Sequence, residues 1–489
     1  MLNFIVGIVE STTESNDVFT FSSLLLVIFT ALLVILVVHT VSTNKQSKNA
    51  PPRMTHYLPV GHIVGFGMHP VKFIQDGRKK FGDMFTARIL NKDMTFLTHP
   101  DVYDLFFKGT DDELGLREVY KFMTPVFGKG VVYDADSQMM MEQVKFVSSG
   151  LTTQRFHHFV DVFEEEVDNK IKQLGETGTF GCTDTMADLI IFTASRSLLG
   201  NGIREFLETK GLGTLYHDLD AGISALSFFY PGIPQGQRDR ASTAIRSIFS
   251  ELIEKRKLNP DDDQDVLNEL LNAKYRESGE PVPKEHIIGV LIAGLFAGQH
   301  TSTIAISWTL MSIISNKHIY EKVMEEQKRI MCEDNAKLSY DKVMEMEYLE
   351  RCMREALRMY PPLIMLMRYV KKARKWGDYI VPKGNVLVVS PSVTGRCEDV
   401  YENPDVFDPE RFAEPRKEHE KKRHANLAFG SGRHKCIGEN FAILQVKSII
   451  SKLLRTYDMK LLGKLPTIDY TSLVVGPTTP CVIEYKKRF

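Results

Sequence analysis

The chain has 489 residues, and its 61 Lys and Arg against 62 Asp and Glu leave a formal net charge of −1. Nucleic-acid binding needs a clustered basic surface, so we expect no nucleic-acid partner. Hydrophobic residues make up 43% and charged residues 25% of the chain, which excludes intrinsic disorder and predicts a large core. Six cysteines without any C-x-x-C pair exclude a disulfide-stapled scaffold and a cysteine zinc finger.

The first predicted element is a membrane-spanning helix. Residues 18–44 carry no charge, and residues 24–38 are almost wholly apolar, which suits the roughly 20 residues that cross hydrocarbon. Acidic residues precede the run (Glu10, Glu14 and Asp17), and basic residues follow it (Lys45, Lys48 and Arg53). These flanks disfavour a cleaved signal peptide and favour a cytosolic body. A buried core helix is the alternative, which the N-terminal position and Pro-rich exit disfavour.

We therefore divide the chain into three parts. Residues 1–44 are expected to form a luminal tail and a single transmembrane anchor, and residues 45–57 a Pro-rich, basic hinge. Residues 58–489 are expected to form the folded cytosolic domain.

Strand signals are few. Residues 84–90 and 94–98, joined through Asn91-Lys92-Asp93, are rich in β-formers and predict a short hairpin. Residues 379–389 show a strand, turn, strand pattern. Between these regions, apolar residues recur every three or four positions from 142 to about 358, so the fold class is mainly α with small β-sheets.

Turn-forming residues interrupt the helical stretch, and one of its helices is unusually apolar. Exposed breaks are expected at residues 230–234 and 259–263. Residues 285–316 are apolar around most of the helix circumference, which predicts a buried helix. Gly298 and Thr301 within it predict a local opening of the hydrogen-bond ladder, where a small molecule could lie. An ordinary core helix is the alternative, and the helix pattern alone favours it.

Two further features follow in chain order. Glu355 and Arg358 lie three residues apart on a predicted helix, so their side chains can meet on one face. Such pairs are common on surfaces and contribute little by themselves. Arg411 lies downstream in the segment Pro409-Glu410-Arg411-Phe412.

The most informative segment is FGSGRHKCIG at residues 429–438, which precedes an apolar periodic run. Its three glycines permit a tight turn and the close approach of a flat ligand, because no Cβ blocks the backbone. A helix N-terminus and basic neighbours favour the thiolate of Cys436, which is the form that haem iron binds. We therefore expect Cys436 to hold a haem iron.

Other interpretations of this region are weaker. A cysteine that merely fills the core would not need such dense glycines. Gly430 and Gly432 begin a dinucleotide fingerprint, but Lys435 occupies the third glycine position. The segment HEKKRH at residues 419–424 is one residue too long for a zinc-binding H-E-x-x-H motif. The remaining cysteines are expected to be structural: Cys182, Cys332, Cys352, Cys397 and Cys481.

The cysteine loop resembles the haem-binding signature of the cytochrome P-450 monooxygenases. The resemblance covers roughly residues 58–486 and implies the cytochrome P-450 fold, a haem-thiolate helical domain shaped as a triangular prism. It implies haem b as cofactor and O2 as co-substrate, with Cys436 as the iron ligand and Phe429 and Gly430 beside the haem. A structural network that supports the haem pocket is implied for Glu355, Arg358 and Arg411.

A narrower resemblance comes from GQHTS at residues 298–302, which is similar to the motif of the sterol 14α-demethylases. Most P-450 proteins carry an acid where this chain has His300. The resemblance implies that Thr301 and His300 are catalytic and organise proton delivery, which a histidine can do near neutral pH. The aromatic segment 120–134 supports the same subfamily, and its alternative is an aromatic core loop.

The subfamily resemblance also implies a set of ligand contacts. Partners for the haem propionates are implied at Tyr120, Tyr133, Arg368 and His434. A sterol cavity is implied for Phe122, Met123, Phe127, Phe296, Ala297, Leu363, Met365, Met367, Leu473 and Val474. Taken singly, each of these is an ordinary core residue, but together they suit a large, rigid, apolar ligand. One match fails, because residues 141–144 lack the basic side chain that the family commonly carries there.

The resemblance implies an endoplasmic-reticulum-anchored monooxygenase that removes the 14α-methyl group of a sterol precursor. Three oxygenations would convert the methyl group to alcohol, aldehyde and formate. Phe122 resembles the residue of members that prefer 4-monomethylated sterols, which favours an obtusifoliol-like over a lanosterol-like substrate. Azole-type haem-ligating inhibitors are expected to bind. The alternatives are another membrane monooxygenase, such as a fatty-acid hydroxylase, and a non-catalytic haem sensor or lipid-binding protein.

We expect no flavin or nicotinamide domain in the remaining chain, so electrons are expected from a separate NADPH-cytochrome P-450 reductase. A basic docking face for this partner is predicted at Lys417, Lys421, Lys422, Arg423 and Lys435. A solvated charge run is the alternative.

Overall fold

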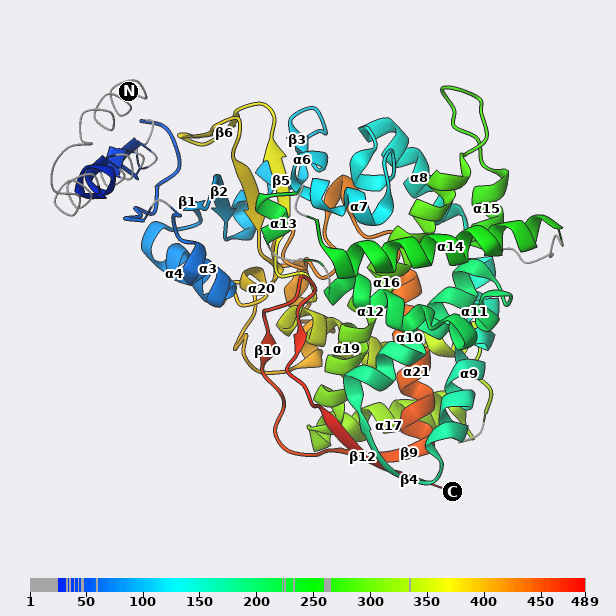
Figure 1. The fold of residues 1–489 in the computed structure, drawn as a ribbon. Coiled ribbons are helices and arrows are strands. Elements are labelled where there is room, and N and C mark those ends of the chain that lie inside the picture. Colours follow the sequence, from blue (N-terminus) through cyan, green and yellow to red (C-terminus); the bar gives the residue numbers. More distant parts are fainter. Residues whose placement is uncertain are drawn as a thin grey trace, which may run out of the picture.

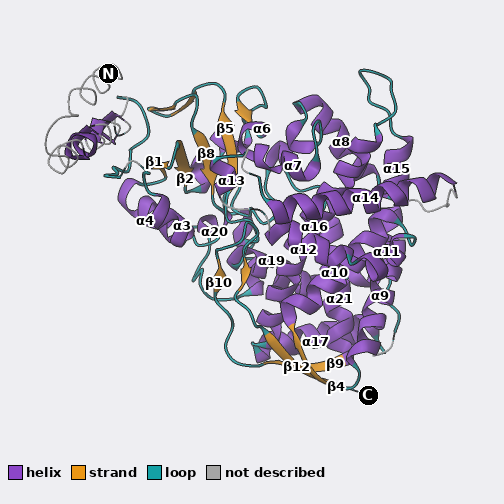
Figure 2. Ribbon diagram, in the orientation of Figure 1, coloured by secondary structure: helices purple, strands orange, loops and turns teal. Residues whose placement is uncertain are grey.

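The computed structural model describes residues 25–31, 34, 37–38, 40–42, 44, 48–58, 60–221, 223, 226–231, 234–258, 265–333 and 336–488. Helices fill most of the body, and a five-stranded sheet lies on one side of it (Figure 1, Figure 2). A three-stranded sheet lies at the lower end, near the C-terminus (Figure 2). The prediction of a mainly helical fold with small sheets is confirmed.

Most of the long helices fall where the sequence shows helical periodicity. They are α4 (Pro70–Phe81), α8 (Ser137–Ser149), α9 (Thr153–Leu174), α10 (Cys182–Leu199), α12 (Leu212–Ala221), α14 (Gly236–Leu258), α16 (Lys284–Ile314), α17 (Lys317–Met331), α19 (Glu347–Met359) and α21 (Glu439–Thr456). Shorter ones are α3 (Ile63–Met68), α5 (Asp104–Phe107), α6 (Arg117–Tyr120), α7 (Thr124–Phe127), α11 (Ile203–Lys210), α13 (Leu226–Phe229), α15 (Val266–Asn272), α18 (Tyr340–Met344) and α20 (Pro391–Thr394). The predicted break at 230–234 separates α13 from α14, whereas the one at 259–263 lies outside the described residues.

The five-stranded sheet has the order β1-β2-β8-β5-β3. Its strands are β1 (Met84–Ile89), β2 (Lys92–Leu97), β3 (Leu114–Gly115), β5 (Leu366–Val370) and β8 (Val386–Val389). The smaller sheets contain β4 (Thr177–Gly181), β9 (Tyr457–Leu461) and β12 (Val482–Lys487), then β6 (Arg374–Trp376) with β7 (Tyr379–Val381), and β10 (Ile468–Asp469) with β11 (Gly476–Pro477). Strands β1 and β2 are antiparallel with Met84 opposite Leu97, so the hairpin prediction is confirmed.

The second β-rich region is arranged differently from a simple strand, turn, strand unit. Strand β7 pairs with β6, and β8 lies between β2 and β5. All four residues of β8 are buried, as expected for a central strand covered on both faces. Strand β4 interrupts the predicted helical stretch because its partner, β12, lies at the other end of the chain, where no local pattern could indicate it.

The predicted membrane span falls partly on residues that the structure does not describe. Residues 25–31 are helical, with Leu26 and Phe29 each 66% exposed. Within the described part of the chain, one helix is long and apolar enough to cross a membrane, and this is α16, which is mostly buried. Helix α16 is therefore a core helix, and the N-terminal anchor stays a prediction.

Part of the predicted hinge is fixed to the body. The backbone N–H of Met54 donates to the carbonyl of Thr86 in β1 at 2.8 Å, and the N–H of Thr86 donates to the carbonyl of Pro52 at 2.8 Å. The ordered body therefore begins no later than Pro52.

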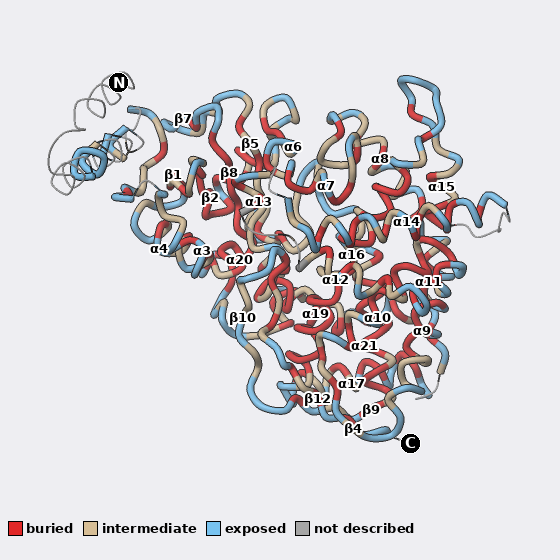
Figure 3. Tube along the Cα trace, viewed as in Figure 1, coloured by how far each residue is buried: buried red, intermediate tan, exposed pale blue. Residues whose placement is uncertain are grey.

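The core is built around α16. This helix contacts α10, α14, α19 and α21, and the buried segments gather along these helices (Figure 3). Trp308 of α16 is 1% exposed and stacks on Tyr360 with ring centroids 3.9 Å apart. Most of α16 is buried, but a short stretch around Ala297 is partly exposed. This stretch borders the candidate functional site.

Candidate functional site

The cysteine loop is a tight turn in front of α21. Gly430 and Gly432 have φ angles of +71° and +68°, which favour glycine. A Cβ on Gly432 would lie 2.9 Å from the carbonyl oxygen of Phe107, so a side chain there would push the loop away from α5. The N–H of Cys436 donates to the carbonyl of Phe429 at 2.9 Å and closes the turn. The glycines of the motif are thus required by the geometry.

The thiol of Cys436 is accessible but closely surrounded. The residue is exposed, yet burial among surrounding atoms raises the pKa of its thiol, against the Gly438 N–H and Lys435, which lower it. The helix N-terminus and the basic neighbour thus act in the predicted direction, through the Gly438 N–H and Lys435, but burial outweighs them, and Lys435 also pairs with Glu439 at 2.5 Å. A bound metal cation is what would deprotonate such a thiol.

One face of α16 is open. A Cβ added to Gly294 or Gly298 would meet no atom within 4 Å, although neighbouring Leu295 is 1% exposed. Helical spacing places Gly294, Ala297, Gly298 and Thr301 on the same face. An uncovered face in the middle of a core helix leaves room for a ligand.

The predicted opening in the α16 ladder is not present. Helix α16 runs unbroken from Lys284 to Ile314. The hydroxyl of Thr301 donates to the carbonyl of Ala297 at 2.6 Å, which is the ordinary bond to the residue one turn earlier. Open space beside the helix therefore comes from the small side chains and not from a break in the backbone.

Aromatic side chains connect the region of the cysteine loop with α16. Tyr133, whose pKa is influenced by Cys436, stacks on Tyr120 with centroids 4.6 Å apart. The Phe127 ring lies 6.2 Å from Tyr133 and 5.9 Å from Phe296, and Phe296 lies 5.3 Å from His300. These contacts join segment 120–134 to the open helix.

The remaining predicted lining residues come from three segments. Phe122 and Met123 are buried beside this aromatic chain, with Phe122 6.2 Å from Tyr120. The segment after Pro362 is tied to the C-terminal one, because the N–H of Val475 donates to the Pro362 carbonyl at 2.8 Å. The predicted residues of these last two segments differ in exposure: Leu363 and Leu473 are 42% and 41% exposed, Met365 and Met367 are half-buried, and Val474 is buried.

Arg368 provides a test of whether haem fits here. Its guanidinium is buried, and within the described chain its Nη1 has no hydrogen-bond partner and no acidic side chain pairs with it. Burial lowers the pKa of Arg368, whereas Tyr120 and Tyr133 raise it, so the three side chains lie close together. A buried cation without an anion is costly, and a carboxylate from a ligand would pair with it. The propionates of haem supply such carboxylates, so these residues fit the group.

His434 lies in the same region but already has an acidic partner. Its Nε2 is 2.8 Å from Asp111 Oδ1. Burial lowers the pKa of His434, Arg368 lowers it further, and Asp111 raises it. His434 and Arg368 therefore lie near enough for the charge of Arg368 to influence the pKa of His434.

The predicted structural network is present as a set of buried ion pairs. Arg358 Nε donates to Glu355 Oε2 at 2.7 Å, and Arg411 Nε donates to Glu355 Oε1 at 2.9 Å. Arg411 also reaches Glu418 at 2.6 Å. Glu418 was not predicted, since it lies seven positions beyond Arg411 and no regular helix or strand of the described chain joins the two.

Sequence reasoning missed the acid that faces His300. Asp220 Oδ2 of α12 lies 3.9 Å from His300 Nδ1. Burial lowers the pKa of His300, and Asp220 raises it. No specific signal marks it in the sequence, because Asp220 is one of two acids on α12, beside His217 and Asp218, and such polar residues ordinarily face solvent.

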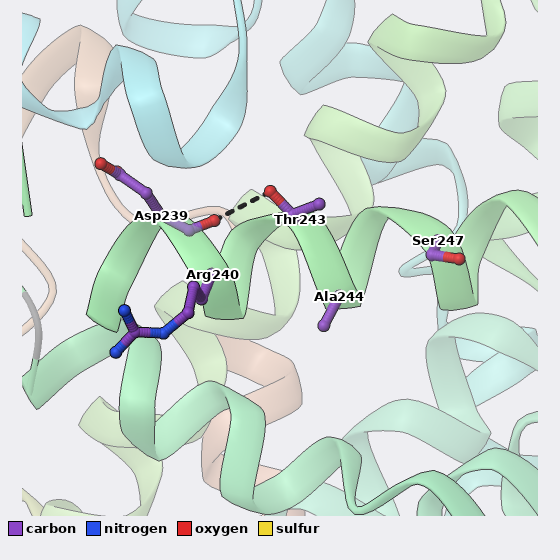
Figure 4. A pocket seen from close by; sticks show the side chains of 5 residues that line it. All are labelled: Asp239, Arg240, Thr243, Ala244 and Ser247. Carbon is purple, nitrogen blue, oxygen red and sulfur yellow. Dashed lines mark hydrogen bonds between the residues drawn. The ribbon is translucent and has the colours of Figure 1, made fainter. Parts of the chain in front are cut away.

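A shallow groove lies elsewhere, on the outer face of α14 (Figure 4). One helix supplies all of its lining residues, which are Asp239, Arg240, Thr243, Ala244 and Ser247. No predicted site residue takes part in it, so it is separate from the site around Cys436.

Comparison with known proteins agrees with this geometry. The family model described as cytochrome P450 matches residues 51–484. Obtusifoliol 14-alpha demethylase of Sorghum bicolor is 37% identical over 90% of this chain and 91% of its own length. Sterol 14-demethylase of Arabidopsis thaliana is 36% identical over 95% of this chain and 97% of its own length. Lanosterol 14-alpha demethylase of Mus musculus is 36% identical over 90% of this chain and 88% of its own length. The solved structure of retinoic acid bound cyanobacterial CYP120A1 has the same fold, with a TM-score of 0.80 at 20% identity, covering 90% of this chain and 100% of that one.

Proposed function

Because the chain belongs to the cytochrome P450 family, and within it to the sterol 14α-demethylases, we propose that it removes the 14α-methyl group of a sterol. The open face of α16 beside the aromatic chain that leads to Cys436 is the observation that carries the proposal. Haem b is the cofactor of this family, and when bound it supplies the oxygen activation that oxidises the methyl group in three steps to formate.

The chain's own residues would hold this cofactor from two directions. Cys436 would ligate the iron as a thiolate. Arg368, Tyr120, Tyr133 and His434 would hold the propionates through charge-assisted hydrogen bonds, since Arg368 Nη1 has no hydrogen-bond partner among the described residues. Together these residues would hold the cofactor at its iron and at its carboxylates.

Proton delivery is assigned to the polar end of the open face. The Thr301 hydroxyl is already oriented by its bond to Ala297, so its oxygen can accept one further hydrogen bond from water. His300 lies on the neighbouring side of the helix, against Asp220. The acid favours the protonated imidazole, so the pair can take up a proton and release it toward the site.

The substrate fits an apolar cavity of Met, Leu and Phe side chains. Phe122 is 3% exposed and lies between Tyr120 and Phe228, with centroids 6.2 Å and 6.5 Å away. Its large ring leaves little room for a second methyl group on the sterol, which supports a 4-monomethylated, obtusifoliol-like substrate. The Sorghum bicolor relative is named for obtusifoliol, whereas the almost equally similar Mus musculus relative is named for lanosterol, so the preference rests on Phe122.

Membrane attachment and an external electron donor complete the proposal. The apolar run at 24–38 would anchor the chain in the endoplasmic reticulum beside an NADPH-cytochrome P-450 reductase. The predicted docking cations each have an acidic neighbour: Lys417 with Glu414, Lys421 with Glu418, Lys422 with Asp101, Arg423 with Asp104 and Lys435 with Glu439. These pairs weaken the positive field, so we expect the reduction rate to depend only slightly on salt.

The test is a reconstituted reaction of the full chain with haem, a reductase and NADPH. Sterols with a 14α-methyl group, the same sterols without it, and a fatty acid serve as substrates. We expect formate and demethylated product only from the first group, and an azole should block the reaction. Hydroxylated fatty acid as the main product would identify a fatty-acid hydroxylase. Ligand-induced spectral shifts without any product would identify a binding protein, and either outcome contradicts the proposal.

A further inference from the structure

A histidine outside every predicted motif contacts the cysteine loop. His424 Nδ1 lies 2.7 Å from Ser431 Oγ, and His424 Nε2 lies 3.0 Å from Asp104 Oδ1 on α5. The His424 side chain is 5% exposed, and its ring stacks on Phe107 with centroids 4.7 Å apart. We propose that the chain Asp104, His424, Ser431 is a tether that positions the cysteine loop for iron binding.

The charges around the tether determine which atom donates the proton in each of its two hydrogen bonds. The hydrogen bond from Lys108, followed by that from His424, lowers the pKa of Asp104, so this group is an acceptor only. The Nε2 atom of His424 must then carry the proton. Burial lowers the pKa of His424, against Asp104, which raises it, while Arg423 and Lys108 lower it. The ring is therefore neutral near pH 7, and its Nδ1 accepts the hydroxyl proton of Ser431.

The backbone of His424 shows that the tether is under constraint. Its φ angle is +62°, a left-handed conformation that is uncommon outside glycine. Such a conformation persists only where the surroundings fix it. Here the stack on Phe107 and the two hydrogen bonds provide that fixation, at the residue from which the chain enters the loop.

Ser431 is the natural point at which to hold the loop. It lies between Gly430 and Gly432, both at positive φ, and glycine backbones lose the most freedom on becoming ordered. Ser431 has the only side chain of the three. A hydrogen bond at this position therefore limits the motions of the turn that would displace Cys436.

Helix α5 supports the loop at a second point. The carbonyl oxygen of Phe107 is the atom that a Cβ on Gly432 would approach. Asp104 and Phe107 are one turn apart on α5, so the same short element holds the loop through Ser431 and through Gly432. The inference rests on Cys436 as the iron ligand and assigns His424 and Asp104 as positioning residues.

The test uses full-length, haem-loaded protein in the reduced, carbon monoxide-bound form. Thiolate ligation gives a red-shifted absorption band. The rate at which this band is lost on incubation measures how well the tether keeps the cysteine loop in position. Ser431→Ala removes the hydroxyl, and His424→Phe keeps a ring on Phe107 but loses both hydrogen bonds. We expect each to accelerate the loss about fivefold, as the removal of one hydrogen bond predicts. The double variant should lose the band no faster than either single variant. Ser431→Thr keeps the hydroxyl and should lose the band at the wild-type rate.

Ser451→Ala is the matched control, because it removes a buried serine hydrogen bond, to Gln327 at 2.6 Å, that does not involve the loop. It should leave the rate of band loss unchanged. A wild-type rate in Ser431→Ala, or additive effects in the double variant, would overturn the tether. If His424→Phe does not fold, Ser431→Ala with its threonine rescue decides the question. A wild-type protein that never shows the band would instead refute Cys436 as the ligand.

Discussion

The regions on the two sides of the proposed haem site satisfy their polar groups in opposite ways. Between α19 and the segment around Arg411, Glu355 accepts from Arg358 and Arg411, and all three are at most 5% exposed. Between α12 and α16, the buried atoms Gln299 Oε1, His300 Nε2 and Asp220 Oδ1 have no hydrogen-bond partner within the described chain.

This difference indicates how rigidity and chemistry are divided in the molecule. A fully paired buried network has one favourable arrangement, so it fixes α19 against the segment that carries Arg411 and Glu418. Unpaired buried groups are costly, and they are kept where water or a ligand can reach them. We infer that the paired network around Glu355 maintains the shape of the site, and that the unpaired groups between α12 and α16 take part in its chemistry.

The largest expected effect comes from breaking the paired side. Glu355→Gln removes the negative charge from between two buried arginines and should lower the free energy of unfolding by about 3–5 kcal/mol. Haem retention should fall in parallel, since the resemblance to the P-450 family implies that this network supports the haem pocket. Denaturant unfolding and haem content measure both effects.

Glu321→Gln is the control for that variant. Its pair with Lys317 spans 3.8 Å, and the two side chains are 59% and 90% exposed. Removing an exposed pair should change stability by less than about 0.5 kcal/mol. Equal losses in the two variants would show that the paired side has no special role.

On the unpaired side, Thr301→Ala should reduce demethylated product roughly a hundredfold, the lower range for the loss of positioned proton transfer. NADPH consumption should continue and appear as reduced oxygen. The ratio of product to NADPH measures this uncoupling. Thr301→Ser keeps the hydroxyl and should retain most of the coupling, and an unchanged ratio in Thr301→Ala would refute the assignment.

The substrate preference tests the cavity itself. Phe122→Leu shortens a buried side chain and should shift the ratio of kcat/KM toward 4,4-dimethylated sterols by about tenfold, the usual effect of space for one methyl group. Competition between the two sterols gives this ratio directly. Met123→Leu conserves side-chain volume at the adjacent position and should leave the ratio of kcat/KM for the two sterols unchanged. A ratio that stays constant in Phe122→Leu would exclude Phe122 as the selecting residue.

The smallest effect is a shift in pH dependence. Asp220 raises the pKa of His300, so Asp220→Asn should lower that pKa further. Because the relay needs the protonated ring, the decline of activity at high pH should begin at a lower pH. Asp218→Asn, on the same helix, is the control, and the pH profile of kcat is the measurement. Identical profiles would exclude Asp220 from proton delivery.

The cysteine loop could be predicted from the sequence because all of its constraints are local. The glycine spacing, Cys436 and the following helix lie within a few residues of each other, and the predicted tight turn is present, with Gly430 and Gly432 at positive φ. The contact between Glu355 and Arg358 could be predicted for the same reason, because helical spacing brings the two side chains together.

Contacts between distant segments could not be predicted. Asp220 and His300 are 80 residues apart and meet because α12 packs near α16, and His424 and Asp104 are 320 residues apart. Strand β8 likewise takes its partners from β2 and β5 and not from its neighbour β7. Periodicity indicates which face of an element is apolar, but tertiary packing decides which polar groups meet.

The central claim is that the sulfur of Cys436 ligates haem iron, and a comparison of the wild type with Cys436→Ser tests it most directly. The wild type, reduced under carbon monoxide, should give the red-shifted Soret band of thiolate ligation. Cys436→Ser should give only the unshifted band and no demethylated sterol. Absence of the shifted band in folded, haem-loaded wild type, or its persistence in the serine variant, would contradict the account.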